Sequence, residues 1–462
     1  MNTRRPTVSA DGMVVTMKLR DDINWSDGEP ITADDFVFTK DMMTNPANTV
    51  YSVYPYDLFE ITAPDPQTVV MTFIDEPFVP WMPNLWLGTL MPKHILQPVF
   101  DAEGSLDNAE WNRAPTVGCG PFTFTTWESG SYLRFDKNPN YWGPEAKLDA
   151  VVFQFVPDDA AQTAACLAGD ADICYWPPYE DMPAFKAAGL DIVTEPSGYN
   201  EGWFINFRDM ASPGIKDLNV RKAIAMGLDR QSNTDLRMGV VKVTETFWDA
   251  IPAYVDPSIV PYKYDPEAAK ALLESSGYVD SNGDGIREDK DGKPLTITQG
   301  NTDKTERTNY QALAQQQLKA IGVDLQTFSY DGDILFADFA NEGPAAIGDL
   351  DIMQWSDAPY FPDPDISYWK CSEIPSLEAP QGSNYFGCDK TLDNLFSQQI
   401  ITTDPKARAQ IMQQISKYMH DNLYYLGIWE DPDTWIVNPR ITGYKFSGVT
   451  PFFNIGEWDV TQ

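Results

Sequence analysis

Two periodicities of apolar and polar side chains alternate along the chain. Residues 14–20 alternate between apolar and polar positions, as a half-buried strand does. Thr32 suits the N-cap of a helix that runs to about Thr44. Because such segments alternate throughout, we predict an α/β protein with mixed sheets. Further strands are expected over 67–74, 122–127, 131–136, 149–156, 202–207, 294–299 and 323–328, helices over 158–168, 217–231, 266–276, 304–321 and about 405–422, and irregular structure over 77–98 and 355–390.

Composition narrows the class of protein. The chain has 462 residues and a formal net charge of −35, which repels phosphate backbones and argues against a nucleic-acid-binding role. No stretch approaches 18 consecutive apolar residues, so we expect no membrane span. The first residues lack the apolar core of a secretory signal. We expect either that a signal was removed or that the chain begins inside a longer protein.

The five cysteines suggest an oxidising compartment. Cys371 and Cys388 bracket a loop rich in Pro, Ser and Gly, and Cys166 and Cys174 flank a predicted turn between a helix and a strand, so we predict two local disulfides. The alternative is that these cysteines are small buried hydrophobic residues. The absence of a C-x-x-C motif and the presence of only two histidines argue against zinc.

Several segments resemble one family, the extracytoplasmic solute-binding proteins of ABC importers, in the peptide, nickel and oligopeptide group (family 5). Residues 19–36, LRDDINWSDGEPITADDF, are similar to the family's LR-x-x-V-x-W-S-D-G-x-P segment. Cys119 replaces the threonine of the family's G-T-G-P-Y/F motif. The other matching segments are 118–122 (GCGPF), 138–143 (NPNYWG), 219–224 (NVRKAI) with the following Asp229-Arg230, and 321–323 (IGV). These segments occur in the same order as in the family and span essentially the whole chain.

The resemblance implies a two-lobed periplasmic-binding-protein-like fold that closes on a solute, here a peptide, and delivers it to an ABC permease in the membrane. It implies a monomer in the periplasm or on the cell surface. We expect a small subdomain of the first lobe over 8–150, its main subdomain over 151–250 plus 446–462, and the second lobe over 251–445. Family members carry tens of residues before the LR-x-x-V-x-W segment, so the main subdomain is expected to lack its first strand here.

The resemblance also indicates solute-binding residues. In peptide-binding relatives a Trp followed shortly by an Asp lies on the second lobe and the Asp pairs with the ligand's α-ammonium, which indicates Trp355 and Asp357. The spacing is one residue shorter here, and a solvated Asp is the alternative. The further candidates are Tyr360 in the same aromatic loop, Trp25 in the turn motif, and Trp203 and Asn206 near a predicted hinge, each weighed against a purely packing role.

Residues 280–291, DSNGDGIREDKD, fit the front of a calcium loop. Oxygen ligands at positions 1, 3 and 5 with Gly at position 6 match the pattern D-x-[DN]-x-[DN]-G, but position 12 is an Asp and Glu288 is a possible substitute. A plain acidic turn is the alternative. No other cofactor is indicated. The candidate ligands are Asp280, Asn282, Asp284, Ile286, Glu288 and Asp291.

Catalysis is not predicted. The chain contains no G-x-S-x-G, H-E-x-x-H, P-loop or G-x-G-x-x-G motif. Three alternatives stay open. One is an oligosaccharide-binding member of the same family, and one is a glycoside hydrolase, which would need two facing carboxylates, one with a raised pKa. The third is a ligand-sensing module that closes in the same way but docks on a signalling partner, which the sequence does not separate from a transport protein.

Overall fold

The computed structural model divides into two compact units. It describes residues 6–50, 53, 55–78, 90–237, 239–358, 367–447 and 451–461. Unit 1 comprises Met1–Glu195, Ile400–Thr403 and Thr434–Gln462, and unit 2 comprises Pro196–Gln399 and Asp404–Asp433. The two units and their mixed sheets confirm the predicted α/β class. Residues 196–250, which the sequence analysis grouped with the first lobe, lie in unit 2; the finer subdomain boundaries stay predictions.

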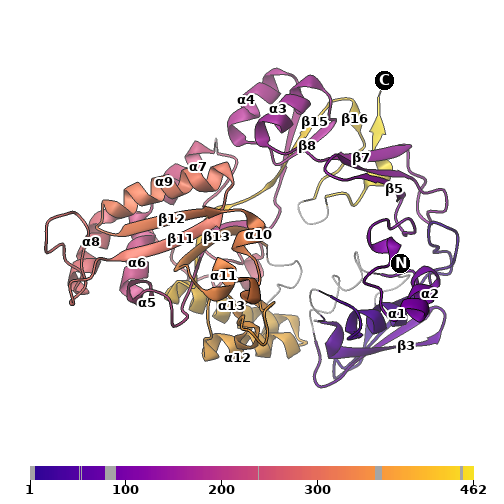
Figure 1. Cartoon of the computed structure of the whole chain (residues 1–462), viewed down its shortest axis with the longest axis horizontal. Helices are drawn as coiled ribbons and strands as arrows, with labels where there is room; N and C mark the ends of the chain where they lie inside the picture. The colour runs from indigo at the N-terminus through magenta and orange to yellow at the C-terminus, as the bar shows by residue number, and fades with distance from the viewer. Residues whose placement is uncertain are drawn as a thin grey trace. The chain divides into compact units, whose positions relative to one another are not determined.

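Unit 1 is built from small sheets, drawn in indigo, purple and yellow in Figure 1. The first has the order β1-β2-β4-β3, the second β5-β6-β7, the third β8-β15-β9 and the last β16-β17. The bounds are β1 Thr7–Val8, β2 Val14–Lys18, β3 Phe59–Asp65, β4 Thr68–Phe73, β5 Phe122–Glu128, β6 Tyr132–Lys137, β7 Ala150–Gln154, β8 Ile173–Tyr175, β9 Asp191–Glu195, β15 Asp433–Val437, β16 Ile441–Thr442 and β17 Asp459–Val460.

Local capping sets the helices of unit 1. Thr32 and Asp35 form a capping box at the start of α1, and Asp158 accepts a hydrogen bond from Ala161 N at the start of α3. Gly169, with φ +75°, ends α3 in the left-handed conformation. The helices are α1 Ala33–Thr44, α2 Lys93–Glu103, α3 Asp159–Ala168 and α4 Met182–Ala187, with short 3₁₀ turns at Tyr56–Leu58, Glu110–Asn112, Tyr179–Asp181 and Ile455–Glu457.

Unit 2 is organised around one five-stranded sheet of order β12-β11-β13-β10-β14. The strands β11, β12 and β13 run parallel to one another, whereas β10 is antiparallel to both of its neighbours. All six residues of β10 are buried. β10, the fourth strand in this order, is therefore enclosed along its whole length. The bounds are β10 Asn200–Ile205, β11 Thr296–Thr302, β12 Asp324–Tyr330, β13 Ile352–Asp357 and β14 Tyr425–Glu430.

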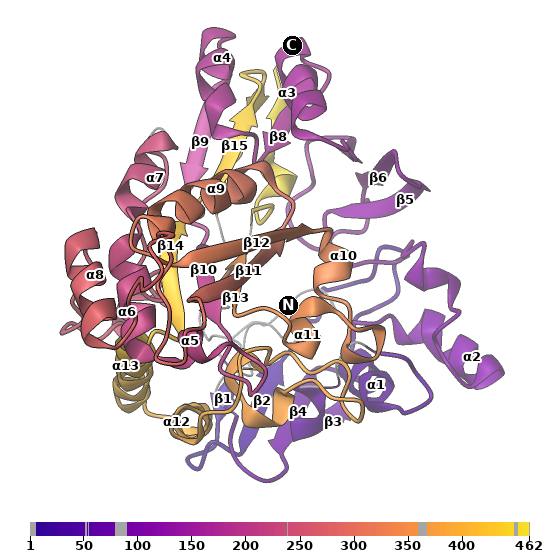
Figure 2. The same cartoon turned by 60° about the vertical axis from the view of Figure 1, so that its left-hand side comes forward.

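Helices lie on both faces of this sheet (Figures 1 and 2). The long helix α9 packs along β11 and β12, and α13 packs against β14. The helices are α5 Pro213–Lys216, α6 Leu218–Gly227, α7 Arg230–Leu236, α8 Pro266–Ser275, α9 Thr305–Lys319, α10 Gly332–Leu335, α11 Pro344–Ile347, α12 Lys390–Ile401 and α13 Pro405–Asn422, with 3₁₀ turns at Pro252–Tyr254, Phe339–Asn341, Ser367–Trp369 and Cys371–Glu373.

The two faces of the central sheet differ in chemistry. On the α9 face, the Arg307 guanidinium donates two hydrogen bonds of 2.8 Å to the Glu201 carboxylate, and Gln354 Nε2 donates a third to the same carboxylate. On the other face, Phe204 is the centre of an aromatic cluster that includes Trp355 and Phe386. A buried charge must be paired to be tolerated, so the first face fixes α9 to β10 and β13.

Three predicted elements differ from the structure. The helix expected over 217–231 is two helices, because Leu228 leaves the helical conformation and Asp229 caps α7. The strand expected to be buried over 149–156 is β7, whose last three residues are exposed. Within the stretch expected to be irregular, α2 begins at Lys93. The apolar content that suggested burial in β7 lies at the surface of unit 1.

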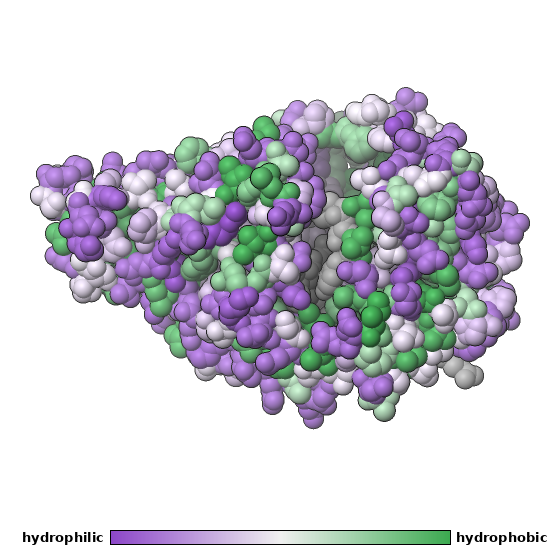
Figure 3. All heavy atoms as spheres, turned by 60° about the horizontal axis from the view of Figure 1, so that its bottom comes forward, coloured by the Kyte–Doolittle hydropathy of each residue, from purple (hydrophilic) through white to green (hydrophobic). Residues whose placement is uncertain are grey.

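The two predicted disulfides are present, joining Cys166 to Cys174 and Cys371 to Cys388, and Cys119 is a free thiol. Among the described helices, none combines the length and apolar character needed to cross a bilayer. The face in Figure 3 is largely hydrophilic, with apolar side chains in separate patches. This surface agrees with the strongly acidic composition.

The buried pair Glu201–Arg307 yields a prediction for stability. Glu201→Gln leaves the Arg307 cation uncompensated, so we expect the free energy of unfolding to fall by about 3 kcal/mol. Urea unfolding followed by tryptophan fluorescence measures the change. Lys417→Met, which removes an exposed ion pair with Asp421, is the control and should change it by less than about 0.5 kcal/mol. A loss in Glu201→Gln no larger than in this control contradicts the prediction.

Candidate functional site

Asp357 ends β13 at the edge of the central sheet of unit 2. It pairs in register with Asn200, the first residue of β10, and Asn200 in turn pairs with Glu430, the last residue of β14. The Asp357 carboxylate is half-buried and accepts hydrogen bonds from Ala358 N at 2.8 Å and from Trp355 Nε1 at 3.3 Å. These two neutral donors orient the carboxylate.

Trp355 supports Asp357 from within the aromatic cluster. Its ring stacks on Phe204 with 4.2 Å between centroids and an interplanar angle of 14°. Phe386, two residues before the disulfide-bonded Cys388, stacks on Phe204 at 5.2 Å. Trp355 is 6% exposed, so its indole is mainly a packing group whose N–H reaches the carboxylate. The disulfide loop thus supports the ring that orients Asp357.

Further carboxylates surround this end of the sheet. Burial raises the pKa of the Tyr199 phenol, and the nearby Asp357 and Asp433 carboxylates raise it further. Asp431 follows β14, and its backbone N donates to Tyr199 O at 2.9 Å. Desolvation, together with repulsion by Glu201, raises the pKa of Asp431 to about 6. Asp357, Asp431 and Asp433 thus place three carboxyl groups around Tyr199, an arrangement suited to a cation.

Two predicted contact residues are enclosed within unit 2. Trp203 has no exposed surface and donates its Nε1–H to Gln354 Oε1 at 2.8 Å. Asn206 is equally enclosed, and its amide donates to Gly348 O and Leu350 O while its Oδ1 accepts from Arg208 N. Both side chains connect strands and loops of the fold. Their polar groups are bonded within the protein and their side chains are fully buried, so Trp203 and Asn206 have a packing role in unit 2.

Trp25 also has a packing position. It is 1% exposed, and its ring centroid lies 6.2 Å from that of His94. Its backbone N donates to Glu29 O and its carbonyl accepts from Gly28 N, which closes the turn in which Gly28 has φ +95°. Asp27 Oδ2 lies 2.7 Å from His94 Nε2. The W-S-D-G motif thus forms a turn attached to the first turn of α2. Tyr360 lies outside the described residues.

Comparison with known proteins agrees with this geometry. The model of the bacterial extracellular solute-binding proteins, family 5, matches residues 2–373. The chain belongs to this family. It is therefore a solute-binding protein of the extracellular type, as predicted.

Curated proteins that are similar to this chain bind different solutes. The oligopeptide-binding protein AppA of Bacillus subtilis is 27% identical over 97% of this chain and 81% of its own length. The nickel-binding periplasmic protein of Escherichia coli is 25% identical over 91% of this chain and 79% of its own. The structure of Bacillus subtilis AppA in complex with a nonapeptide superposes with a TM-score of 0.80, at 24% identity, over 99% of this chain and 89% of that one.

Several site residues of this family member were not found from the sequence. Tyr199, Asp431 and Asp433 were not singled out, although Asp431 directly follows the apolar run of β14 and Asp433 begins β15. Polar residues directly after a buried strand lie at a sheet edge, which is the signal that could have indicated them. Tyr199 precedes β10 and carries no such signal.

The predicted calcium loop forms a compact acidic turn. Carboxylate oxygens of Asp280, Asp284 and Glu288 lie within 4.8 Å of one another, whereas Asp291 is exposed and pairs with Lys290. This cluster includes Glu288, the possible substitute, and does not include Asp291. Asn282 donates to Asp284 and Glu288, and Ile286 donates its backbone N–H to Asp284. Calcium binding stays a prediction.

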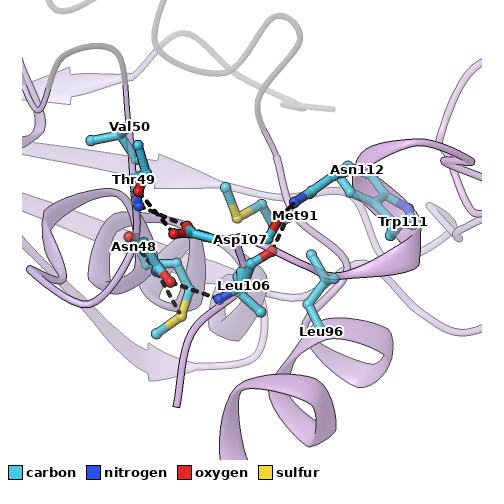
Figure 4. Close-up of a pocket in the computed structure, with 10 residues that line it drawn as sticks. Asn48, Thr49, Val50, Met91, Leu96, Leu106, Asp107, Trp111 and Asn112 are labelled. Atoms are coloured by element: carbon cyan, nitrogen blue, oxygen red, sulfur yellow. Dashed lines mark hydrogen bonds between the residues drawn. The ribbon is translucent and has the colours of Figure 1, made fainter. Parts of the chain in front are cut away.

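A separate cavity of about 360 Å³ lies within unit 1 (Figure 4). Met42, Leu96 and Leu106 form apolar walls between α1 and α2. Its polar side chains are engaged with the protein: Asp107 accepts from Thr49 N and Oγ1, and Asn112 donates to Leu106 O. The cavity is part of the packing of α1 on α2.

The raised pKa of Asp431 predicts a pH dependence of stability. The folded state binds the Asp431 proton more tightly than the unfolded state, so the free energy of unfolding falls as the pH rises from about 4 to 6 and then levels. Asp431→Asn removes this pH-dependent loss. Between pH 4 and pH 7, the free energy of unfolding of the variant should therefore rise by about 1–3 kcal/mol relative to that of wild type. Urea unfolding at both pH values measures it, with the exposed Asp333→Asn as control. A difference that does not change with pH contradicts the prediction.

The acidic turn yields a second prediction. If oxygen ligands from Asp280, Asp284 and Glu288 hold Ca²⁺, millimolar CaCl₂ should raise the melting temperature by several degrees and EGTA should reverse it. Asp284→Asn should abolish the rise, and Asp291→Asn should leave it intact. An equal melting temperature in CaCl₂ and EGTA assigns the segment to a metal-free acidic turn.

Proposed function

We propose that this chain captures oligopeptides outside the cytoplasmic membrane and delivers them unaltered to the permease of an ABC importer. The observation that carries the proposal is the half-buried, oriented carboxylate of Asp357 in an electronegative edge of the unit 2 sheet. The oligopeptide-binding name of the Bacillus subtilis relative supports the same solute class. The protein acts as a monomer in this proposal.

A peptide offers the group that Asp357 suits. Its α-ammonium is a compact cation with three donors, and a charge-assisted hydrogen bond to a carboxylate is about twice as strong as a neutral one. Because Trp355 and Ala358 already orient the Asp357 carboxylate, little ordering is required when the cation binds. The net charge of −35 further favours cations over anions in the approach of the solute.

A nickel ligand held by histidine is less well supported. The chain has two histidines. His420 is buried between Glu245 at 3.2 Å and Asp421 at 3.4 Å, and His94 contacts Asp27 at 2.7 Å. Both imidazoles have carboxylate partners within the protein, so neither is placed to coordinate a metal chelate. Oligosaccharide binding stays an alternative, and the calorimetric titrations described below for peptides should include oligosaccharides.

Catalysis is not part of this proposal. A glycoside hydrolase needs a carboxylic acid with a raised pKa facing a second carboxylate. Asp431 has a raised pKa, but its main charged neighbour Glu201 is bonded to Arg307 through both oxygens. Recovery of unaltered peptide by mass spectrometry after incubation tests this point, and turnover of peptide or glycoside would contradict it.

The pairing of Asp357 with an α-ammonium predicts the effect of N-acetylation. Isothermal titration of wild type should show that N-acetylation weakens binding of a matched peptide at least about tenfold, since it removes the cation. Asp357→Asn should weaken binding of the free-amine peptide by a similar factor. It should leave the affinity for the acetylated peptide within about twofold of the wild-type value. Native mass spectrometry of the purified protein first identifies peptides that co-purify.

The exposed Glu274→Gln serves as the matched control, because it removes one charge from α8 of unit 2, which precedes the start of β11, whereas Asp357 lies at the opposite, C-terminal end of the parallel strands. It should change neither affinity by more than about twofold. Equal affinity of wild type for the free and the acetylated peptide would show that Asp357 does not pair with the ammonium. Binding of neither peptide would reject the peptide proposal itself.

A further inference from the structure

Apolar side chains are exposed at one end of the central sheet of unit 2. Phe336 is 38% exposed and Ile334 is 57% exposed. Ile334 lies in α10 and Phe336 directly follows it, and α10 itself follows the end of β12 (Figure 2). The Phe336 ring contacts the Trp355 indole edge to face, with 5.3 Å between centroids and an interplanar angle of 82°. Phe336 thus combines exposed apolar surface with a contact to the indole that bonds to Asp357.

The strand register places the exposed rings and Asp357 on one face of the sheet. Met353 of β13 pairs with Gly300 of β11, and Gly300 pairs with Phe328 of β12. Paired residues of neighbouring strands point to the same face, and so do alternate residues along one strand. Trp355 and Asp357 therefore share a face with Phe328, whose ring is 42% exposed.

The base of this face is also apolar. At Gly300, an added Cβ would lie 2.4 Å from Leu350 Cδ1 and 3.3 Å from Tyr330 Cε2, so the Leu350 side chain and the Tyr330 ring cover the backbone of β11. The Tyr330 ring also stacks with Phe328, with 6.4 Å between centroids. Because α10 packs against β11, the apolar surface continues from β12 toward Phe336.

The carboxylates on either side of Phe336 have partners within the protein. Asp331 accepts from Asp333 N at 2.9 Å at the start of α10, and Asp338 accepts from Gln381 Nε2 at 2.9 Å. The side chain of Asp333 is exposed, so a basic side chain is the competing occupant of this surface. The exposed rings favour an apolar occupant, since burying their surface is favourable and requires no charge to be desolvated.

We infer that Phe336 is a specificity-determining residue, which packs on the side chain of the first residue of the bound peptide and favours an aromatic one. The inference rests on the proposed function and adds a preference among peptides. In a peptide, the α-ammonium and the first side chain are attached to the same Cα atom. Because Asp357 and Phe336 both contact Trp355, a peptide whose ammonium pairs with Asp357 has its first side chain nearest to Phe336.

The Phe336 ring is held in place before the peptide binds. Trp355 contacts it from one side, and the Tyr385 ring lies 6.4 Å from it. A ring that is already ordered loses little conformational freedom when another group packs on it. Aromatic pairs also gain from offset or edge contacts beyond the area they bury, so a first-residue phenylalanine should bind more tightly than alanine.

Matched tetrapeptides test the inference. Isothermal titration of the full chain with Ala-Ala-Ala-Ala, and with the four peptides that carry one Phe, should show the largest gain in affinity, about tenfold, when Phe is the first residue. In Phe336→Ala, the ratio of the Phe-first to the all-alanine affinity should fall to within about twofold. Phe336→Leu keeps a large apolar side chain and should retain a ratio of at least about threefold.

The control is Tyr264→Ala, which removes another exposed aromatic side chain of unit 2, just before α8. It should leave the ratio at its wild-type value. An unchanged ratio in folded Phe336→Ala overturns the inference while peptide capture stands. An equal loss of both affinities counts as such a result, because it shows that Phe336 acts only by packing on Trp355.

Two further measurements in wild type distinguish the remaining outcomes. Tighter binding of Lys-Ala-Ala-Ala than of Phe-Ala-Ala-Ala assigns the surface to a basic side chain and overturns the aromatic preference. Absence of binding of every peptide to the folded protein overturns the proposed function as well. Thermal unfolding checks that each variant is folded. If Phe336→Ala does not fold, the position of Phe decides: the greatest gain at the first residue supports the inference, and the greatest gain elsewhere overturns it.

Discussion

The buried ion pair between Glu201 and Arg307 is the interaction on which the arrangement of unit 2 depends. It joins the buried strand β10 to α9, and Gln354 extends the same network to β13. Because a single ionised partner inside the protein would be very costly, the pair holds these three elements in one register. Asp357 ends β13, so the position of the candidate site follows from this network.

The two faces of the sheet at β10 and β13 have different structural roles. The polar face fixes the helix, and the aromatic face around Phe204 supports the Trp355 indole that bonds to Asp357. Rigid aromatic packing and two neutral hydrogen bonds orient the Asp357 carboxylate. In the proposed function, a charged solute group meets a carboxylate that is already in place, which lowers the entropy lost on binding.

Unit 1 uses a comparable device at the end of β8. Trp435 supports Tyr175 as Phe204 supports Trp355, and in both cases a buried ring carries a group at the end of a strand. The disulfides strengthen the parallel, because Cys174 lies in β8 and Cys388 lies two residues after Phe386. The strand ends of both units are thus rigid, which suits a protein whose task is to hold a solute.

Local features were predictable from the sequence because their causes are local. The Thr32 cap, the glycine that ends α3 and the two short-range disulfides each depend on residues close together in the chain. The ordered motifs indicated the family, and Asp357 was indicated through that resemblance. Tertiary packing decided the rest. Glu201 meets Arg307 across 106 residues, Trp203 and Asn206 are enclosed by distant strands, and the ring of Phe336, after α10, contacts Trp355 of β13. Which side chains remain accessible is set by contacts between segments remote in sequence, and no local pattern encodes them.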